Sequence, residues 1–515
     1  MQRFSLVKSA AVLGIDAIIL NVECHIQSGS LPKFITVGLP EGAVKESKER
    51  VLAAIKNLGF RIPGNKIVIN LAPADIKKDG SSLDLPIAIG ILKAAGYIND
   101  GIIDNYVVLG ELSLDGKIRP IRGALPISVS VQKQKKIKGI ILPKENAREA
   151  AITGDLEIIG VDHLRDAMNF LNNTIKIDQT KINTEELFDQ SSLYLQDFID
   201  VKGQENVKRA LEVAAAGGHN LLMIGPPGSG KTMMAKRFPT ILPKLTLGEA
   251  LETTKIHSVA GVLPTDEGII AQRPYRSPHH TISDAALVGG GRVPKPGEVS
   301  LSHHGVLFLD ELPEFKKNVL EVLRQPLENG SVTIARAQMS LTYPASFLLV
   351  AAMNPCPCGY ATDTGNDCTC TSTQIQKYMA KISGPLLDRI DIHIEVPAIN
   401  LNDLAGKKKG ETSGNIRKRV QRAREIQSQR FASYDKIFSN SHMESKLIAK
   451  YCKLDHASGE LLKQAMDRLG LSARAYDRIL KVSRTIADLN NSQNIEMQHL
   501  SEAIQYRSLD RKMWQ

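Results

Sequence analysis

The sequence predicts an α/β protein with an α+β N-terminal domain, a three-layer α/β core and an all-helical C-terminal domain. Short β-rich runs alternate with helical stretches over residues 1–170. From about Phe198 onward, the chain repeats helix, apolar strand, glycine loop and helix, which is typical of a three-layer α/β domain. Beyond residue 415 only helical periodicity remains.

The N-terminal elements follow from local pattern. Helices are predicted at Glu46–Leu58, which Gly59 ends, and within Pro86–Ala95, which Gly96 ends. The predicted strands are Ile15–Val22, Lys33–Val37, Lys66–Leu71 and Tyr106–Leu109. Asp16 interrupts the apolar stretch after Ala10, so the start of the chain is interpreted as a strand and not as a signal peptide.

Composition shifts divide the chain. The predicted order is an N-terminal domain at 1–170, a polar linker at 171–197, a core at 198–400, a second linker at 401–415 and a helical lid at 416–515. In the lid, Gly470 ends one helix and Ser472 caps the next. No segment approaches 18 uninterrupted apolar residues, so we expect no membrane span and a cytoplasmic protein.

A phosphate-binding loop follows the apolar strand Leu221–Ile224. It fits the pattern G-x-x-x-x-G-K-[ST], with a strand before it and a helix after it. Glycines let backbone N–H groups turn toward phosphates, Lys231 would contact the β- and γ-phosphates, and Thr232 would ligate Mg²⁺. The predicted nucleotide-binding residues are Gly225, Pro226, Pro227, Gly228, Ser229, Gly230, Lys231 and Thr232.

Two further strand ends complete a predicted hydrolytic site. Asp310 and Glu311 follow the apolar run Val306–Leu309, so Asp310 would hold Mg²⁺ and Glu311 would deprotonate the attacking water. Asn354 follows a third strand, Phe347–Ala352, and could position that water, although an Asn before Pro355 is also a good turn residue.

With these strands in order, the sequence resembles the AAA+ ATPases of the magnesium-chelatase-like branch. Four segments make it similar to the competence-associated ComM/YifB type, from the first strand to the C-terminus: Arg276–Thr281, Gly289–Glu298, Asn354–Gly359 and Gly384–Asp391. The resemblance implies a homo-oligomeric ring, expected to be a hexamer, with ATP and Mg²⁺ at subunit interfaces. It also implies that Asn354 is the sensor-1 residue, Arg389 the arginine finger and Arg474 the sensor-2 arginine of the lid.

The N-terminal domain resembles the proteolytic domain of Lon-type proteases. Ser82 stands at the serine position of that family, but the position of the dyad lysine is occupied by Leu125. A serine without its amine base is a poor nucleophile. We therefore expect a protease-like fold without peptidase activity, with a role in regulation, assembly or substrate engagement.

Four of the six cysteines fall in a 15-residue window. Cys356, Cys358, Cys368 and Cys370 form two C-x-C pairs that could hold a structural zinc ion. Reduced free thiols and a redox-labile pair are the alternatives.

The net charge of +10 is concentrated near the C-terminus, where the last 115 residues hold 22 basic and 13 acidic side chains. This excess indicates either a solvated helical surface or a phosphate-binding one.

A hairpin is predicted from Val332–Ala335 and Ser340–Tyr343, with Arg336 at its tip. The candidate DNA contacts are Lys295, Arg336, Arg417, Lys418, Arg422 and Arg424. His279–His280 and His303–His304 are interpreted as packing or loop residues.

The leading hypothesis is an ATP-driven DNA helicase or translocase that promotes branch migration during natural transformation. The alternative is a remodelling ATPase that acts on a protein partner or assists metal chelation. An ATP-dependent protease is disfavoured by Leu125.

Overall fold

The computed structural model describes residues 4–27, 33–39, 42–62, 66–74, 78, 80–183, 194–264, 268–291, 294–336, 339–363, 365–398, 410–434 and 437–509. Its contacts divide the chain into two compact units. The N-terminal unit comprises residues 1–191 and 247–271, and the C-terminal unit comprises residues 192–246 and 272–515. The mixed α/β fold class predicted from the sequence is confirmed.

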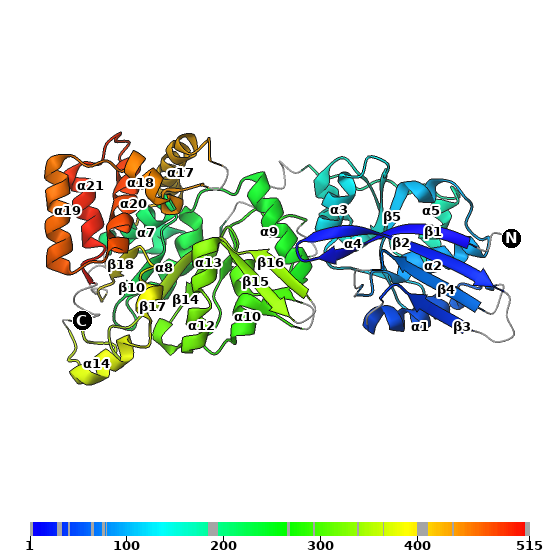
Figure 1. Ribbon diagram of the computed structural model, residues 1–515, viewed down its shortest axis with the longest axis horizontal. Coiled ribbons are helices and arrows are strands. Elements are labelled where there is room, and N and C mark those ends of the chain that lie inside the picture. The colour runs from blue at the N-terminus through cyan, green and yellow to red at the C-terminus, as the bar shows by residue number, and fades with distance from the viewer. Residues whose placement is uncertain are drawn as a thin grey trace. The chain divides into compact units, whose positions relative to one another are not determined.

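The N-terminal unit is built on a mixed sheet, whose order within the described residues is β3-β4-β2-β1-β5-β8-β9 (Figure 1). Its strands are β1 (Phe4–Leu13), β2 (Asp16–Gln27), β3 (Lys33–Val37), β4 (Lys66–Ala72), β5 (Tyr106–Val108), β8 (Gly139–Pro143) and β9 (Glu157–Val161). The predicted strands at 33–37 and 66–71 are therefore confirmed, and the one at 15–22 lies largely within the longer β2.

Helix α2 (Asp84–Ala94) is buried along its whole length. Apart from Asp84 and Lys93 its residues are apolar all round, as expected for a helix that lies between layers and not on a surface. Other helices of the unit are α1 (Gly42–Asn57), α3 (Ala124–Gln132), α4 (Lys144–Ala150) and α5 (Leu164–Leu171). Leu125 lies buried in α3, and its N–H donates to Glu149 Oε1 at 2.8 Å.

Helix α9 (Leu247–Ala260) belongs to the N-terminal unit, although it follows the phosphate-binding loop in sequence. Ser258 of α9 hydrogen-bonds to the buried Glu149 of α4. Burial raises the pKa of Glu149 by more than its hydrogen bonds from the Ser258 hydroxyl and the Leu125 N–H lower it. A helix that lies in sequence between two parts of the second unit therefore packs against α3 in the first.

The C-terminal unit is built on a parallel sheet, whose order within the described residues is β11-β14-β17-β10-β18 (Figure 1). Every adjacent pair is parallel. The strands are β11 (Tyr275–Arg276), β14 (Val306–Leu309), β17 (Leu348–Met353), β10 (Leu221–Ile224) and β18 (Ile392–Glu395). Strands β14, β17 and β10 are entirely apolar and buried, as strands covered on both faces must be.

Helices surround this sheet and lead into the C-terminal helical region. They include α7 (Glu205–Gly217), α8 (Lys231–Arg237), α10 (Asp284–Val288), α11 (Glu298–Leu301), α12 (Lys317–Glu321), α13 (Arg324–Asn329), α14 (Ser372–Met379) and α15 (Gly384–Leu387). The predicted hairpin forms from β15 (Ser331–Arg336) and β16 (Met339–Pro344), paired from Ser331↔Pro344 to Arg336↔Met339. Its tip and the side chain of Arg336 lie outside the described residues.

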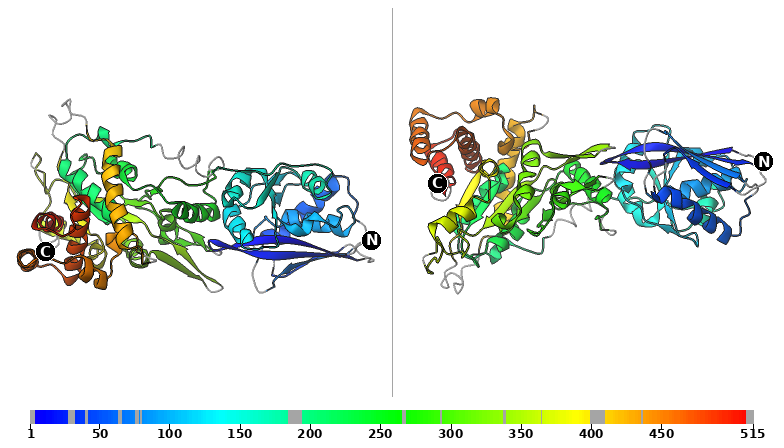
Figure 2. Two further views of the ribbon diagram at one scale, coloured as in Figure 1. Left: turned by 90° about the horizontal axis from the view of Figure 1, so that it is seen from above. Right: turned by 60° about the horizontal axis from the view of Figure 1, so that its bottom comes forward.

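The C-terminal helices are α17 (Ser413–Arg430), α18 (Ser445–Tyr451), α19 (His456–Leu469), α20 (Ala473–Leu489) and α21 (Met497–Gln505). Their apolar faces share one core with α7 and the sheet, through residues such as Val420, Ile486 and Val213. Figure 2 shows α17 as a long amber helix, with the red-brown helices gathered beside it. The predicted cap is present, because Ser472 accepts a hydrogen bond from the Ala475 N–H.

Within the described residues, no helix is both long enough and apolar enough to cross a bilayer.

Candidate nucleotide site

The predicted phosphate-binding loop joins the end of β10 to the start of α8. Gly225 lies against β18, where any side chain would collide with the Val396 carbonyl oxygen. Gly230 has a φ of +88°, a left-handed conformation that favours glycine. Two of the motif's glycines are thus required by the backbone path itself, and not only by the shape of a ligand.

Lys231 is buried inside this loop. Its Nζ donates to the carbonyl oxygens of Gly225 at 2.7 Å and Pro226 at 2.8 Å, and lies 3.3 Å from Asn354 Oδ1. Burial lowers the pKa of Lys231. The ammonium group is therefore held by neutral oxygens that a phosphate would outcompete.

Asp310 and Thr232 meet at the same sheet edge. The Thr232 hydroxyl donates to Asp310 Oδ2 at 2.6 Å, while Asp310 Oδ1 accepts the Glu311 N–H at 3.0 Å. Since β10, β17 and β14 are adjacent and parallel, Lys231, Asn354 and Asp310 converge at their carboxyl ends. The oxygens of Thr232 and Asp310 form a donor pair suited to Mg²⁺, which prefers hard oxygen ligands.

Glu311 has a different partner. Its Oε2 lies 3.3 Å from Nδ1 of His280, in the loop after β11. The backbone of Glu311 has a φ of +53°, which is unusual for a residue with a side chain. Glu311 follows its strand as the sequence predicts, and His280, predicted to be a packing or loop residue, contacts it from the loop after β11.

The arginine-finger candidate lies at the opposite edge of the sheet. Arg389 precedes the start of β18, whose Ile392 pairs with Leu221 at the start of β10. Arg389 therefore lies near the start of β10, whereas the phosphate-binding loop follows its end at Ile224. The four residues of β10, about 13 Å of strand, separate Arg389 from that loop. Arg389 is buried, donates to the Pro385 carbonyl oxygen and forms an ion pair with Glu328.

Arg474 lies beside Arg389 and not beside the phosphate-binding loop. Its Nη1 is 3.6 Å from Asp388 Oδ2, and both arginines line a cavity of about 620 Å³ together with Arg478 and Lys481. Burial lowers the pKa of Arg389, and the neighbouring guanidinium groups of Arg324, Arg474 and Arg478 lower it further. Carboxylates line the same cavity, so the arginines are held in an ion-pair network that includes Glu328, Asp388 and Asp391.

A buried carboxylate connects this cavity to the core. Asp391 accepts from His219 Nδ1 at 3.1 Å and forms an ion pair with Arg478 of α20. Burial alone would raise the pKa of Asp391, but Arg478 and His219 outweigh it and the net shift is downward. The arginine-bearing helix is thereby fixed to the strand that leads to the phosphate-binding loop.

A second cavity, of about 370 Å³, lies beside the same loop and is lined by parts of α7, β18 and α21. Gln204 lines it and donates through Nε2 to the carbonyl oxygens of Ser229 and Pro397, both at 3.0 Å. Its Oε1 is buried without a hydrogen-bond partner among the described residues. This acceptor could receive the amino group of a nucleotide base. The sequence analysis missed Gln204, because no motif marks it.

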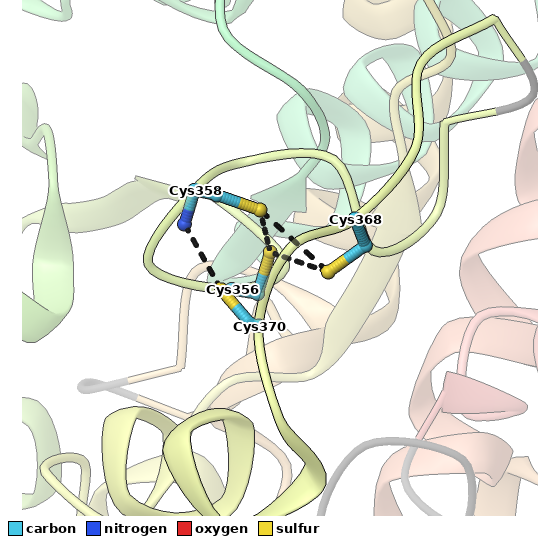
Figure 3. Close-up of side chains that lie close together, drawn as sticks. All are labelled: Cys356, Cys358, Cys368 and Cys370. Atoms are coloured by element: carbon cyan, nitrogen blue, oxygen red, sulfur yellow. Dashed lines mark hydrogen bonds between the residues drawn. The ribbon is translucent and has the colours of Figure 1, made fainter.

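The four clustered cysteines come together as predicted (Figure 3). Cys356 Sγ lies 3.3 Å from Cys358 Sγ and 3.7 Å from Cys368 Sγ, and the four sulfurs all lie within 4.8 Å of one another. Sulfurs around a tetrahedral zinc at about 2.3 Å are about 3.8 Å apart, so the donor set fits zinc. Gly359, in the same loop, contacts Pro227 so closely that a Cβ would clash with it.

The candidate DNA contacts separate by exposure. Lys295 of β13 (Lys295–Pro296) is exposed, as are Lys418 and Arg422 of α17. Arg417 instead donates to the Thr240 carbonyl oxygen at 2.7 Å, and Arg424 donates to the Phe438 carbonyl oxygen at 3.2 Å. Arg417 and Arg424 therefore already form hydrogen bonds within the chain.

The chain is similar to known proteins over most of its length. Residues 197–404 match the family described as magnesium chelatase, subunit ChlI. Residues 22–146 match the family described as subunit ChlI of Mg-chelatase, and residues 410–507 match its C-terminal family.

Full-length relatives are also found. The chain is 45% identical over 510 residues to the competence protein ComM of Haemophilus influenzae, covering 98% of each chain. It is 44% identical to the uncharacterized protein YifB of Escherichia coli, covering 98% of this chain and 97% of the relative. A magnesium-chelatase 67 kDa subunit of Chlorobaculum parvum is 28% identical over 164 residues, covering 31% of this chain and 23% of that protein.

Proposed function

Because the chain belongs to the magnesium-chelatase-like AAA+ family that includes the ComM and YifB proteins, we propose that it is an ATP-driven ring motor that promotes DNA branch migration. The observation that carries the motor proposal is the separation of Lys231 from Arg389 by the length of β10. A single chain cannot bring both groups to one phosphate. In a ring, one subunit can supply Lys231 and its neighbour can supply Arg389 to the same phosphate.

The residues have distinct roles in this proposal. Lys231 leaves its carbonyl partners to bind the β- and γ-phosphates, and Thr232 with Asp310 would hold Mg²⁺, which neutralises phosphate charge when bound. Glu311 accepts the proton of the attacking water, and Asn354 orients that water. Arg389 and Arg474 of the neighbouring subunit stabilise charge on the transferred phosphoryl group.

The DNA part of the proposal is supported by the exposed cations Lys295, Lys418 and Arg422 and by the name of the Haemophilus relative. Phosphate contacts make affinity fall steeply as salt rises. The role proposed for the motor is branch migration during natural transformation, in a hexameric ring.

The test uses a fluorescently labelled three-strand DNA junction with ATP and Mg²⁺. Wild-type protein should displace the labelled strand, and Lys231→Ala should not. An active ATPase that displaces no strand would overturn the DNA assignment and leave the ATPase in place.

A remodelling ATPase is the second candidate, since part of the chain resembles a magnesium-chelatase subunit. It predicts ATPase stimulation by a protein partner and none by branched DNA. Measuring ATP turnover with each addition separates the two proposals.

We further propose that Cys356, Cys358, Cys368 and Cys370 hold one structural zinc ion. The sulfur spacing described above supports this assignment. The loop that carries these residues also contacts Pro227 of the phosphate-binding loop.

A further inference from the structure

Asp391 joins the two elements that carry the candidate arginines. It lies directly before β18 and two residues after Arg389. Its side chain is buried and forms an ion pair with Arg478 of α20. Arg478 follows Arg474 by four residues, so both lie on one face of that helix. One buried ion pair therefore connects the segment of Arg389 to the helix of Arg474.

The segment around Arg389 is itself held by the residues between α7 and β10. Nδ2 of Asn220 donates to the Arg389 carbonyl oxygen at 3.0 Å, and the Asn220 carbonyl oxygen accepts the Asp391 N–H at 3.0 Å. Nη1 of Arg507 donates to the Ile390 carbonyl oxygen at 2.6 Å. These contacts fix the position of Asp391 relative to the sheet.

His219 adds a second link to the same helix. Its Nδ1 lies 3.1 Å from Asp391 Oδ2, and its Nε2 lies 2.8 Å from Oγ1 of Thr485 on α20. Thr485 is about two helical turns beyond Arg478, so both lie on the same face of α20. Two contacts so spaced fix the rotation of the helix about its axis and its position along it. In Figure 1, α20 lies beside α7, with which it packs.

The network leaves both candidate arginines able to bind a further group. Nη1 of Arg389 donates to the Pro385 carbonyl oxygen and Nη2 pairs with Glu328, but Nε is buried without a partner among the described residues. Arg474 is exposed and lies 3.6 Å from Asp388. Both line the cavity of about 620 Å³. A phosphate in that cavity meets both groups only if α20 keeps its place beside the segment of Arg389.

We propose that Asp391 is a positioning residue that sets Arg389 and Arg474 as a pair toward the nucleotide of the neighbouring subunit. This inference rests on the proposed function, in which both arginines act on that nucleotide. The carboxylate touches no phosphate. It acts through Arg478, by holding α20 against the segment that precedes β18.

The first test measures the steady-state ATPase rate of Asp391→Asn, which keeps the size of the side chain but removes the charge that holds Arg478. We expect kcat to fall about 10- to 100-fold, the cost of misplacing a group by about 1 Å. The KM for ATP should change less than about twofold, because Lys231 lies at the opposite edge of the sheet. Arg478→Gln should show the same split, and Arg478→Lys, which keeps the charge, should retain most of the rate.

Subunit mixing separates positioning from a general loss of structure. Asp391→Asn mixed in equal amounts with Lys231→Ala should return toward one quarter of the wild-type ATPase rate, because the intact loops of one variant then meet the intact arginines of the other. Mixed with Arg389→Ala, it should not exceed the mean of the two separate rates, because both substitutions affect the arginine edge. If Asp391→Asn does not fold, Arg478→Gln takes its place in both mixtures.

The matched control is Glu444→Gln, which removes the same charge from an exposed side chain that lines the same cavity. It should keep the wild-type kcat. An Asp391→Asn kcat within about twofold of wild type would overturn the inference, and so would a fall in kcat that Lys231→Ala subunits do not restore. If Lys231→Ala and Arg389→Ala subunits fail to restore each other, the proposed ring function is overturned instead.

Discussion

At the scale of single residues, the buried ionisable groups of the C-terminal unit make its stability depend on pH. His219 lies in the core of this unit, where Nδ1 is 3.1 Å from Asp391 Oδ2 and Nε2 is 2.8 Å from Thr485 Oγ1. Burial lowers its pKa below the usual value, although Asp391 acts in the opposite direction. The folded protein therefore keeps this imidazole neutral at a pH where the unfolded chain would protonate it.

This difference predicts a loss of stability in acid. Because the folded pKa of His219 is below the unfolded one, the stability that His219 contributes is fully present above about pH 6.5 and falls as the pH drops below that value. Thermal unfolding of wild type and His219→Asn between pH 7 and pH 5 should show a shallower decline for the variant. Parallel declines would contradict the prediction.

Sequence motifs predicted the positions of individual site residues, but not which other residues contact them. The phosphate-binding loop and the Asp310–Glu311 turn are marked by local patterns, and both occur where predicted. Gln204 and His280 carry no such pattern, because their contacts with Ser229 and Glu311 join segments 25 and 31 residues apart. Only the folded sheet brings these pairs together.

At the scale of elements, the cysteine loop links two parts of the nucleotide site. It follows Asn354 directly, and its Gly359 abuts Pro227. A metal ion that fixes this loop would therefore stabilise the phosphate-binding loop from outside.

This arrangement predicts about one zinc ion per chain in protein purified without chelator. Cys358→Ser and Cys368→Ser should lose the metal, unfold at lower temperature and bind ATP less tightly, because the support for Pro227 is weakened. Metal analysis and calorimetry provide the readouts. Cys452→Ser, at a buried cysteine outside the cluster, should keep its zinc. Protein with no zinc, or full zinc in the cluster variants, would contradict the proposal.

The composition of helix α17 did not predict which of its arginines make contacts within the chain. Its arginines were grouped as one basic surface, but the fold assigns some of them to internal contacts. Arg417 packs 5.5 Å from the Tyr194 ring centroid, and Arg419 pairs with Glu212 and Glu411. Helical periodicity predicts which residues share a face, but not which acceptors the rest of the chain places opposite them.

The exposed pair on α17 gives a sharper prediction about DNA. The double variant Lys418→Gln/Arg422→Gln should bind DNA more weakly, and the slope of log affinity against log salt should become shallower by about 2. Its thermal stability should be unchanged, because both side chains are exposed. Fluorescence anisotropy across a salt series measures the slope.

The matched control is Lys453→Gln/Lys463→Gln, which removes the same charge from exposed positions in and near α19. It should leave the slope as in wild type. Equal slopes for all three proteins would exclude α17 from the DNA contact.

At the scale of the whole molecule, the opposite placement of Lys231 and Arg389 would make activity a property of neighbouring subunits in the proposed ring. In a head-to-tail ring, each nucleotide would receive Lys231 from one chain and Arg389 from the next. The sequence indicated both residues, and the family resemblance implied their roles. The strand register showed that they belong to different edges of the sheet.

This placement predicts that two inactive proteins restore each other. Lys231→Ala and Arg389→Ala should each lower kcat by about 10³-fold. The two variants are mixed in equal amounts and allowed to exchange subunits. In a head-to-tail ring, about one quarter of the interfaces should then pair an intact loop with an intact arginine, and ATPase activity should return toward one quarter of the wild-type value.

Mixing Lys231→Ala with Thr232→Ala should restore no activity, since both substitutions lie in the same loop and every site stays damaged. If both mixtures stay inactive although exchange is demonstrated by fluorescence transfer between labelled subunits, Arg389 does not act on a neighbour's nucleotide.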